Sequence, residues 1–348
     1  MKAPNFWYQP PSALAALLAP FGCLYDLAGR VRRLRASPHT PGVPTVCVGN
    51  LVAGGAGKTP VALAVADLLT GWGAAPHFLT RGYGGKLAGP QRVAPGRHEA
   101  SDVGDEALLL AQRAPTWIAH DRKAGASAAI AAGAHSLVLD DGFQNFALTY
   151  RLSLLVVDGA VGFGNGKVMP AGPLRESLGR GLARASALVI LGDDLTGVGG
   201  GVTEFAANAG LHLPIFQARL EPDHAVAAAL RGRRVLAFAG IGRPAKFFET
   251  LERRVGARIV DRVAFADHQP YDEKHIERLL ERARRQDAQA VTTAKDFVRL
   301  PEALRSEVRV LPVTVAWHNV GAFTRLLAEK LGHRPAGHAS EGDHHGRS

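Results

Sequence analysis

Short apolar runs alternate with longer stretches rich in alanine and leucine along the first half of the chain. Each run holds four to six residues and ends at a glycine or a polar residue, as buried strands of a parallel sheet do. The stretches between the runs have helical patterns, and this alternation predicts a doubly wound α/β sheet. The predicted strands are residues 45–48, 77–80, 116–119, 136–139, 152–157 and 187–191, and the predicted helices include 60–69, 106–113 and 124–132.

A glycine-rich stretch, DDLTGVGGGVT at residues 193–203, interrupts this alternation and indicates a loop or linker. A second α/β pattern follows it, so we expect a domain boundary between about 195 and 225, with a larger domain over residues 36–210 and a smaller one over 211–332. Residues 333–348 are mainly small, charged or histidine residues and predict a disordered tail. The apolar runs of the smaller domain are 234–239, 257–260, 290–293 and 308–315, with a helix expected at 274–285.

The N-terminal segment, residues 1–35, has a pattern of its own. An apolar stretch at 12–28 is interrupted by Pro20, Gly22 and Asp26 and is followed by four arginines, the reverse of the charge order in a secretory signal peptide. As a helix the stretch would reach roughly 25 Å, less than the hydrocarbon core of a bilayer at about 30 Å. We expect a membrane-surface helix or short anchor with its basic end at the cytoplasmic face. The alternative is an apolar helix packed on the protein itself.

Composition adds an expected partner. Lysine and arginine exceed aspartate and glutamate by 10 among the 348 residues, which favours an anionic partner such as a nucleotide, a nucleic acid or a membrane surface. The two cysteines, Cys23 and Cys47, belong to no CxxC or Cys/His array, which argues against a zinc site.

The stretch GNLVAGGAGKTP at residues 49–60 follows the first predicted strand and precedes a predicted helix. Its glycines allow a tight turn whose N–H groups point at phosphate oxygens, the lysine would reach the β- and γ-phosphates, and the threonine would bind Mg²⁺. Valine stands where the usual pattern has its first glycine, and an ordinary glycine-rich turn is the alternative. The predicted phosphate-binding residues are Val52, Ala53, Gly54, Gly55, Ala56, Gly57, Lys58 and Thr59.

A second apolar run ends in two acids, Asp140 and Asp141. Because the carboxyl ends of parallel strands meet at one edge of a sheet, these side chains would emerge beside the phosphate loop, where one of them should hold Mg²⁺. A solvated turn is the alternative. Together the two motifs predict a fold similar to that of P-loop nucleotide hydrolases, which binds a nucleoside triphosphate and Mg²⁺.

Further motifs resemble those of the tetraacyldisaccharide 4′-kinase family, the lipid A 4′-kinases of Gram-negative bacteria. The resemblance extends from the N-terminal helix to about residue 317. It implies transfer of the γ-phosphate of ATP to the 4′-hydroxyl of a tetraacyl glucosamine disaccharide 1-phosphate, which forms lipid IVA at the cytoplasmic face of the inner membrane. The motifs are GNLVAGGAGKTP at 49–60, TRGYGG at 80–85, DVGDE at 102–106, DDGFQ at 140–144, FGNGKVMPAGPLRES at 163–177, FADHQPY at 265–271 and TTAKDFVRL at 292–300.

By this resemblance Asp105 and His268 form a catalytic dyad in which Asp105 receives or orients the 4′-hydroxyl proton. Since the two residues come from different predicted domains, closure of the cleft would assemble the site and exclude water. The alternatives are a loop histidine and an acid at a helix N-terminus. Other expected roles are metal binding by Glu106 and Glu176, phosphate binding by Arg175, and contact of Tyr83 with a sugar ring. We assign no chemistry to Lys295 and Asp296.

The sequence departs from the family pattern at two positions. Asn145 replaces the histidine that usually follows DDGFQ, which leaves any role of that histidine in doubt, and Ser177 replaces a common proline. Other functional classes fit less well. Partitioning ATPases carry a lysine where this chain has Ala53. A GTPase metal chaperone would need a cysteine motif beside the TAKD at 293–296, and no basic–aromatic motif supports nucleic-acid binding.

Overall fold

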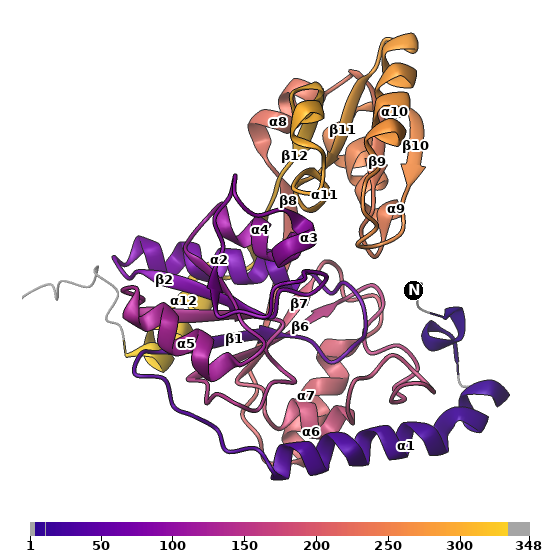
Figure 1. Ribbon diagram of the computed structural model, residues 1–348. Coiled ribbons are helices and arrows are strands. Elements are labelled where there is room, and N and C mark those ends of the chain that lie inside the picture. The colour runs from indigo at the N-terminus through magenta and orange to yellow at the C-terminus, as the bar shows by residue number, and fades with distance from the viewer. Residues whose placement is uncertain (1–3, 11, 333–348) are drawn as a thin grey trace, which may run out of the picture.

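The computed structural model describes residues 4–10 and 12–332, in which the chain forms a large and a small α/β domain (Figure 1). The large domain contains a nine-stranded sheet in the order β13-β8-β7-β6-β1-β5-β2-β4-β3. Its edge strands β3 and β13 run antiparallel to their neighbours, and the other strands pair in parallel, as predicted. The strands are β1 (Thr45–Gly49), β2 (Pro76–Thr80), β3 (Gln91–Arg92), β4 (Thr116–Ile118), β5 (Ser136–Asp140), β6 (Leu152–Asp158), β7 (Ala187–Leu191), β8 (Ile215–Pro222) and β13 (Val313–Trp317).

Helices cover both faces of this sheet, which makes it doubly wound. α2 and α12 pack on one face, and α5, α6 and α7 pack on the other. The helices of the large domain are α1 (Ala13–Leu34), α2 (Lys58–Gly71), α3 (Ala100–Val103), α4 (Asp105–Ala111), α5 (Arg122–Ala131), α6 (Leu178–Leu182), α7 (Val198–Asn208) and α12 (Val320–Leu331), and a 3₁₀ turn spans Asn5–Tyr8.

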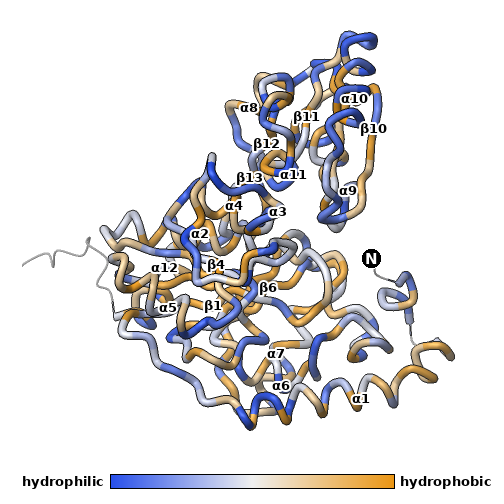
Figure 2. Tube along the Cα trace, in the orientation of Figure 1, coloured by the Kyte–Doolittle hydropathy of each residue, from blue (hydrophilic) through white to orange (hydrophobic). Residues whose placement is uncertain are grey.

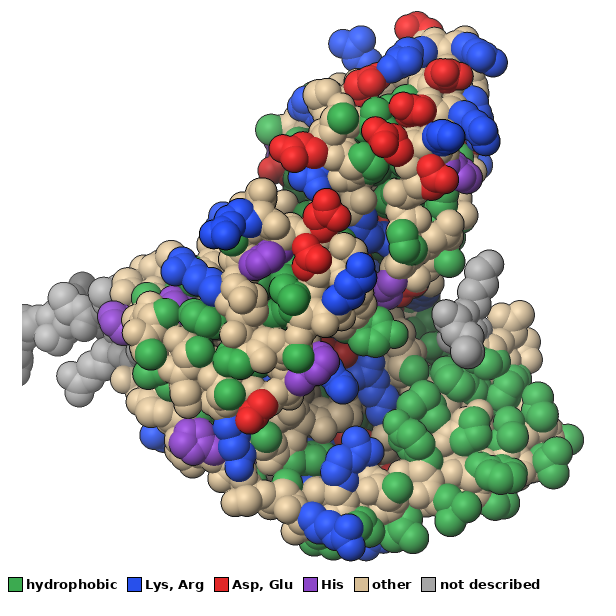
Figure 3. Space-filling view, viewed as in Figure 1, with side chains coloured by type: hydrophobic (Ala, Val, Ile, Leu, Met, Phe, Trp, Pro, Cys, Tyr) green, Lys and Arg blue, Asp and Glu red, His purple; other side chains and the backbone are tan. Residues whose placement is uncertain are grey.

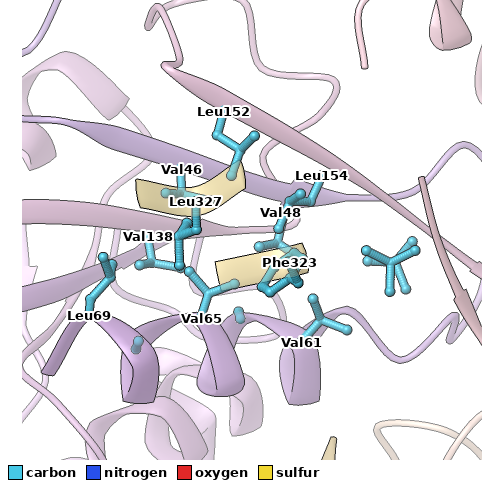
Figure 4. Close-up of a cluster of buried hydrophobic side chains, with 14 of the residues drawn as sticks. Val46, Val48, Val61, Val65, Leu69, Val138, Leu152, Leu154, Phe323 and Leu327 are labelled. Carbon is cyan, nitrogen blue, oxygen red and sulfur yellow. The ribbon is translucent and has the colours of Figure 1, made fainter. Parts of the chain in front are cut away.

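The core on the α2 face shows why the central strands are apolar at every position. Val46 and Val48 of β1 point toward α2, whereas Cys47 points to the opposite face, because successive side chains of a strand alternate. Valines of α2 and two residues of α12, Phe323 and Leu327, pack against this face of the sheet (Figure 4). Burial on both faces fixes β1, and with it the loop that follows, in one position.

The small domain contains a four-stranded parallel sheet in the order β10-β9-β11-β12. Two apolar clusters, one on each face of β9, hold its helices in place. Its elements are α8 (His224–Leu230), β9 (Arg234–Ala239), α9 (Pro244–Glu249), a π-helical turn (Thr250–Val255), β10 (Arg258–Ala264), α10 (Glu273–Arg285), β11 (Gln289–Thr293), α11 (Ala294–Phe297), a 3₁₀ turn (Glu302–Glu307) and β12 (Val308–Leu311).

The sheets divide the chain differently from the predicted domain boundaries. β8 belongs to the large sheet, and the predicted run 308–315 is two strands, β12 in the small sheet and β13 in the large one. Pro312, which has no N–H group to donate to a ladder, separates them. The described residues then end with α12 on the large domain, so the small domain is an insertion between β8 and β13. The predicted tail at 333–348 lies outside the described residues.

The N-terminal helix α1 lies along the outer edge of the large domain (Figure 1). Within the described residues it is the one helix long and apolar enough to cross a membrane. Only Ala15 and Gly22 are buried, and its hydrophobic positions form much of the helix surface (Figures 2 and 3), which argues against the alternative of a packed core helix. The exposed apolar side chains are Leu14, Leu17, Phe21, Leu24, Tyr25, Leu27, Val31 and Leu34.

Two contacts attach α1 to the large domain. A Cβ atom on Gly22 would lie 2.8 Å from the Val168 carbonyl oxygen, so the glycine allows the helix backbone to approach the loop 163–177 closely. One turn further along, Asp26 accepts a hydrogen bond from the Ser177 N–H at 3.0 Å and pairs with Arg180. The helix is therefore held beside the segment that carries Arg175.

Candidate active site at the carboxyl edge of the large sheet

The loop after β1 forms a cradle at the N-terminus of α2. Gly57 caps α2 with a left-handed backbone (φ +81°), and a Cβ atom there would lie 2.4 Å from Leu191, so only glycine fits. The loop 173–175 holds the cradle from the side, through bonds from Ala53 N–H to Pro173 O at 2.8 Å and from Arg175 N–H to Leu51 O at 2.7 Å. The 14-residue α2 therefore points its free N–H groups and positive dipole end into the cradle.

The buried Asp140 and the partly exposed Asp141 face the start of α2 from the end of β5. The Thr59 hydroxyl donates to Asp140 Oδ2 at 2.8 Å, while Asp140 Oδ1 is buried without a hydrogen-bond partner. Burial, and then the nearby Glu106 carboxylate, raise the pKa of Asp140 to about 7. A buried anionic oxygen without a partner, beside a hydroxyl, fits a cation that takes its other ligands from phosphates and water. Among the described residues no group of three His, Cys, Asp or Glu side chains could hold a metal by itself.

The adjacent Asp141 faces the cations of the cradle. Its carboxylate lies 3.7 Å from Lys58 Nζ and 2.9 Å from an Arg175 guanidinium nitrogen. Burial alone would raise the pKa of Asp141, but Lys58 and Arg175 hold it below its ordinary value. Asp141 also has a positive φ of 53°, a strained backbone for a residue other than glycine. The cradle therefore contains two cations whose charge is balanced by a single neighbouring carboxylate.

Across from the cradle, Asp105 and His268 meet although they come from different domains. Asp105 is the first residue of α4 and is 3% exposed, and its carboxylate lies 3.1 Å from His268 Nδ1. His268 is also left-handed, with φ +59°. The Asp105 contact raises the pKa of His268 against the opposing effect of burial. Burial acts to raise the pKa of Asp105, yet His268 and Lys295 bring it below its usual value.

Tyr83 lies beside the dyad on the loop 82–85. Its ring meets the His268 ring edge to face at a centroid distance of 5.4 Å, and the residue is 66% exposed. The loop lies directly on the start of α4: a Cβ atom on Gly104 would be 2.4 Å from the Tyr83 carbonyl oxygen. Gly104, with φ +87°, thus lets the Tyr83 loop and the Asp105 helix approach one another.

Two further predicted metal ligands, Glu106 and Glu176, are paired with cations. Glu106 lies 3.4 Å from Lys295 Nζ, and Glu176 lies 2.5 Å from Arg184, whose guanidinium stacks on the Phe143 ring. The contacts of Glu176 therefore give no support to its predicted metal role. Asn145, at the position of the family histidine, accepts a hydrogen bond from the Ala147 N–H at 3.0 Å and closes a turn.

Sequence reasoning gave no role to three charged residues that connect the domains. Lys295 contacts the dyad histidine, with Nζ 3.2 Å from His268 Nε2. Arg299, whose side chain is 4% exposed, lies 3.7 Å from Asp105 and donates to Gly240 O at 2.8 Å. Arg243 pairs with Asp158 at the end of β6. The TTAKDFVRL motif at 292–300 was the one available signal for Lys295 and Arg299.

The contacts of Asp296 bear on the GTPase alternative. Its buried carboxylate accepts bonds from Gly240 N–H at 3.0 Å, Tyr271 OH at 2.7 Å and Thr293 Oγ1 at 2.6 Å. An acid that recognises guanine has to present its carboxylate to the base. Asp296 is fully enclosed by its own domain, so the TAKD sequence is a structural feature here.

Comparison with known proteins gives consistent matches over nearly the whole chain. A model of the family described as tetraacyldisaccharide-1-P 4′-kinase matches residues 14–332. The tetraacyldisaccharide 4′-kinase of Rhodospirillum centenum is 54% identical over 335 residues, covering 95% of this chain and 97% of the relative. That of Paramagnetospirillum magneticum is 49% identical over 334 residues, covering 96% and 100%.

A solved structure has the same fold. It is a crystal structure of an "apo" form of LpxK from Aquifex aeolicus in complex with ATP, and it superposes with a TM-score of 0.69. The match covers 91% of this chain and 99% of that chain at 24% sequence identity.

Proposed function

Because this chain belongs to the tetraacyldisaccharide-1-P 4′-kinase family, we propose that the cradle after β1 and the Asp105–His268 pair are the two halves of its active site. The protein is an ATP-dependent kinase that phosphorylates the lipid A precursor, a tetraacyl disaccharide 1-phosphate, at its 4′ position to form lipid IVA. The predicted family membership is confirmed. The observation that supports the site assignment is that the cradle faces a buried acid, Asp105, in contact with the partly exposed imidazole of His268.

The cradle binds the triphosphate of ATP. Its backbone N–H groups and the dipole of α2 attract phosphate oxygens, and Lys58 neutralises charge on the β- and γ-phosphates. Arg175 contacts the same Asp141 carboxylate as Lys58, and its planar guanidinium group suits a second phosphate contact. Thr59 and Asp140 would hold Mg²⁺, which screens phosphate charge when bound.

The Asp105–His268 pair receives the acceptor. As the 4′-hydroxyl oxygen attacks the γ-phosphorus, its proton passes to the pair, whose carboxylate and imidazole are in hydrogen-bond contact at 3.1 Å. The exposed ring of Tyr83 lies against the sugar at the edge of the same pair. Since His268 belongs to the small domain, the pair exists only when the domains are closed, which limits hydrolysis of ATP by water.

The exposed apolar side chains of α1 dock on the inner membrane, where the acylated acceptor resides. Their burial would remove a continuous hydrophobic surface from water, and Arg30, Arg32, Arg33 and Arg35 at the other end of the helix would meet anionic headgroups at the cytoplasmic face. The contacts of Gly22 and Asp26 fix this helix to the kinase domain.

The activity is tested directly with labelled nucleotide. We expect purified protein with Mg²⁺ and γ-labelled ATP to transfer label to the tetraacyl disaccharide 1-phosphate, and GTP to be a poor donor. Thin-layer separation of the lipid measures the product, and a lipid already phosphorylated at the 4′ position is the control acceptor. Label released only as inorganic phosphate, whether or not the lipid is present, would contradict a lipid kinase.

Membrane docking is tested by charge on α1. We expect Leu17→Glu combined with Leu24→Glu to weaken sedimentation with phosphatidylethanolamine–phosphatidylglycerol vesicles at least about tenfold, because each leucine contributes about 1.5–3 kcal/mol when buried. Leu195→Glu combined with Leu211→Glu is the matched control, since these leucines are exposed elsewhere on the large domain. Equal binding by the two double variants would exclude α1 as the docking surface.

A further inference from the structure

Lys295 is the charged residue closest to the dyad that the proposed mechanism leaves without a role. It is in α11 of the small domain, which packs against α4 of the large domain (Figure 1). Its Nζ lies 3.2 Å from His268 Nε2 and 3.4 Å from both Glu106 Oε1 and Asp267 Oδ1. Its ammonium is thus placed between the small-domain loop of His268 and the large-domain helix of Asp105.

The position of the dyad limits where the phosphoryl group can be. An acceptor hydroxyl that contacts the Asp105–His268 pair must lie about 3–3.5 Å from the phosphorus it attacks. A cation that contacts His268 therefore lies on the side of the site where the γ-phosphate has to be. The small domain also reaches the cradle, because a Cβ atom on Gly242 would lie 3.5 Å from the Gly55 nitrogen and 3.6 Å from Asp267.

The local charge points the same way. Carboxylates of Asp105, Glu106 and Asp267 line this side of the site, and a triphosphate that arrives here adds further negative charge. Lys58 is already next to Asp141 on the far side. Proximity of Glu106 and Asp105 raises the pKa of Lys295 despite its burial, so the ammonium stays charged.

We propose that Lys295 is a second catalytic cation, delivered by the small domain to the transferred phosphoryl group opposite Lys58; this inference rests on the proposed kinase function. The 4′-oxygen forms a bond to the γ-phosphorus as the bond from that phosphorus to the β–γ bridging oxygen breaks. The electron pair leaves with ADP and the hydroxyl proton goes to the Asp105–His268 pair. Lys295 exchanges no proton and stabilises the charge on the γ-phosphate oxygens, on which catalysis of phosphoryl transfer depends.

The test compares Lys295→Met with two controls. We expect Lys295→Met to lower kcat about 10²–10³-fold with the KM for ATP changed less than about threefold, because the cation acts mainly in the transition state. Lys274→Met removes one exposed charge from the same domain, and Arg243→Met breaks a different bridge between the domains. Lys295→Arg restores part of the rate.

Binding measurements separate catalysis from domain bridging. We expect Lys295→Met to weaken binding of ADP–aluminium fluoride, a mimic of the transferring phosphoryl group, about as much as it lowers kcat, while affinity for ADP is kept. In Arg243→Met the ratio of the two affinities stays at the wild-type value. The proposal is overturned if Lys295→Met keeps the ratio of the two affinities within about twofold of the wild-type value. If Lys295→Met unfolds at a lower temperature than the wild type, Lys295→Gln takes its place in the test. A wild-type ratio in a Lys295→Gln protein with a normal unfolding temperature then overturns the proposal. A wild-type protein that labels no lipid would refute the proposed function instead.

Discussion

Replacing Lys58 with methionine is expected to abolish measurable transfer of phosphate to the lipid, a loss of at least about a hundredfold in kcat/KM. Methionine keeps the length and the apolar stem of the side chain but removes the only ammonium within the cradle sequence 52–59. The N–H groups of the cradle remain, so nucleotide still has a place to bind, but charge on the β- and γ-phosphates is left without its nearest cation. Initial rates with labelled ATP measure the loss.

The control for this result is Lys330→Met, on the exposed face of α12 at the far end of the chain. Both variants should melt within a few degrees of the wild type, because neither lysine belongs to the apolar clusters of the core, and methionine keeps the buried stem of Lys58 in place. A Lys58→Met protein with a normal melting temperature and more than about half of the wild-type rate would remove the cradle from the mechanism.

The second large effect is expected from the dyad. Asp105→Asn and His268→Gln should each lower kcat by about 10²–10⁴-fold, the usual contribution of a positioned general base. Both replacements are similar in size to the original side chains. They therefore remove the ionisable groups of the 3.1 Å contact and largely keep the packing around it. Because the two residues handle one proton, the double variant should be little slower than the slower single variant.

The double-mutant cycle distinguishes a dyad from two independent residues. Losses that multiply fully would mean that Asp105 and His268 act separately, whatever their distance. His275→Gln serves as the control, since this histidine lies in the same domain on α10 and contacts the Phe265 ring, away from Asp105. It should leave kcat within about twofold of wild type.

The parts of the site that could be predicted from sequence are local. Strand, glycine-rich turn and helix follow one another within 45–71, so residue type alone places Lys58 and Thr59 where the turn meets the helix, although the helix was predicted to begin at residue 60 and α2 begins at Lys58. The position of the acids at the end of β5 could be predicted equally well, because the carboxyl ends of parallel strands meet at one edge of the sheet. The meeting of Thr59 with Asp140 follows from the parallel pairing of β1 and β5.

Contacts between distant segments could not be predicted in this way. His268 is 163 residues from Asp105, and no periodicity specifies that contact; only the resemblance to a family paired them. The cross-domain contacts of Lys295 with Glu106 and of Arg299 with Asp105 were missed for the same reason. The return of the chain to the large sheet was also missed, because an apolar run shows that a strand is buried but not which sheet it joins.

The insertion of the small domain between β8 and β13 has a mechanical consequence. Those strands are antiparallel neighbours, and Pro222 pairs directly with Val313, so the two connections leave the large domain side by side. Two adjacent connections therefore hold the small domain, which carries His268 and Lys295, and they restrict its position more than a single tether would. Cutting one connection would leave the small domain on a single tether. Its effective concentration at the nucleotide site would then fall as that tether becomes longer.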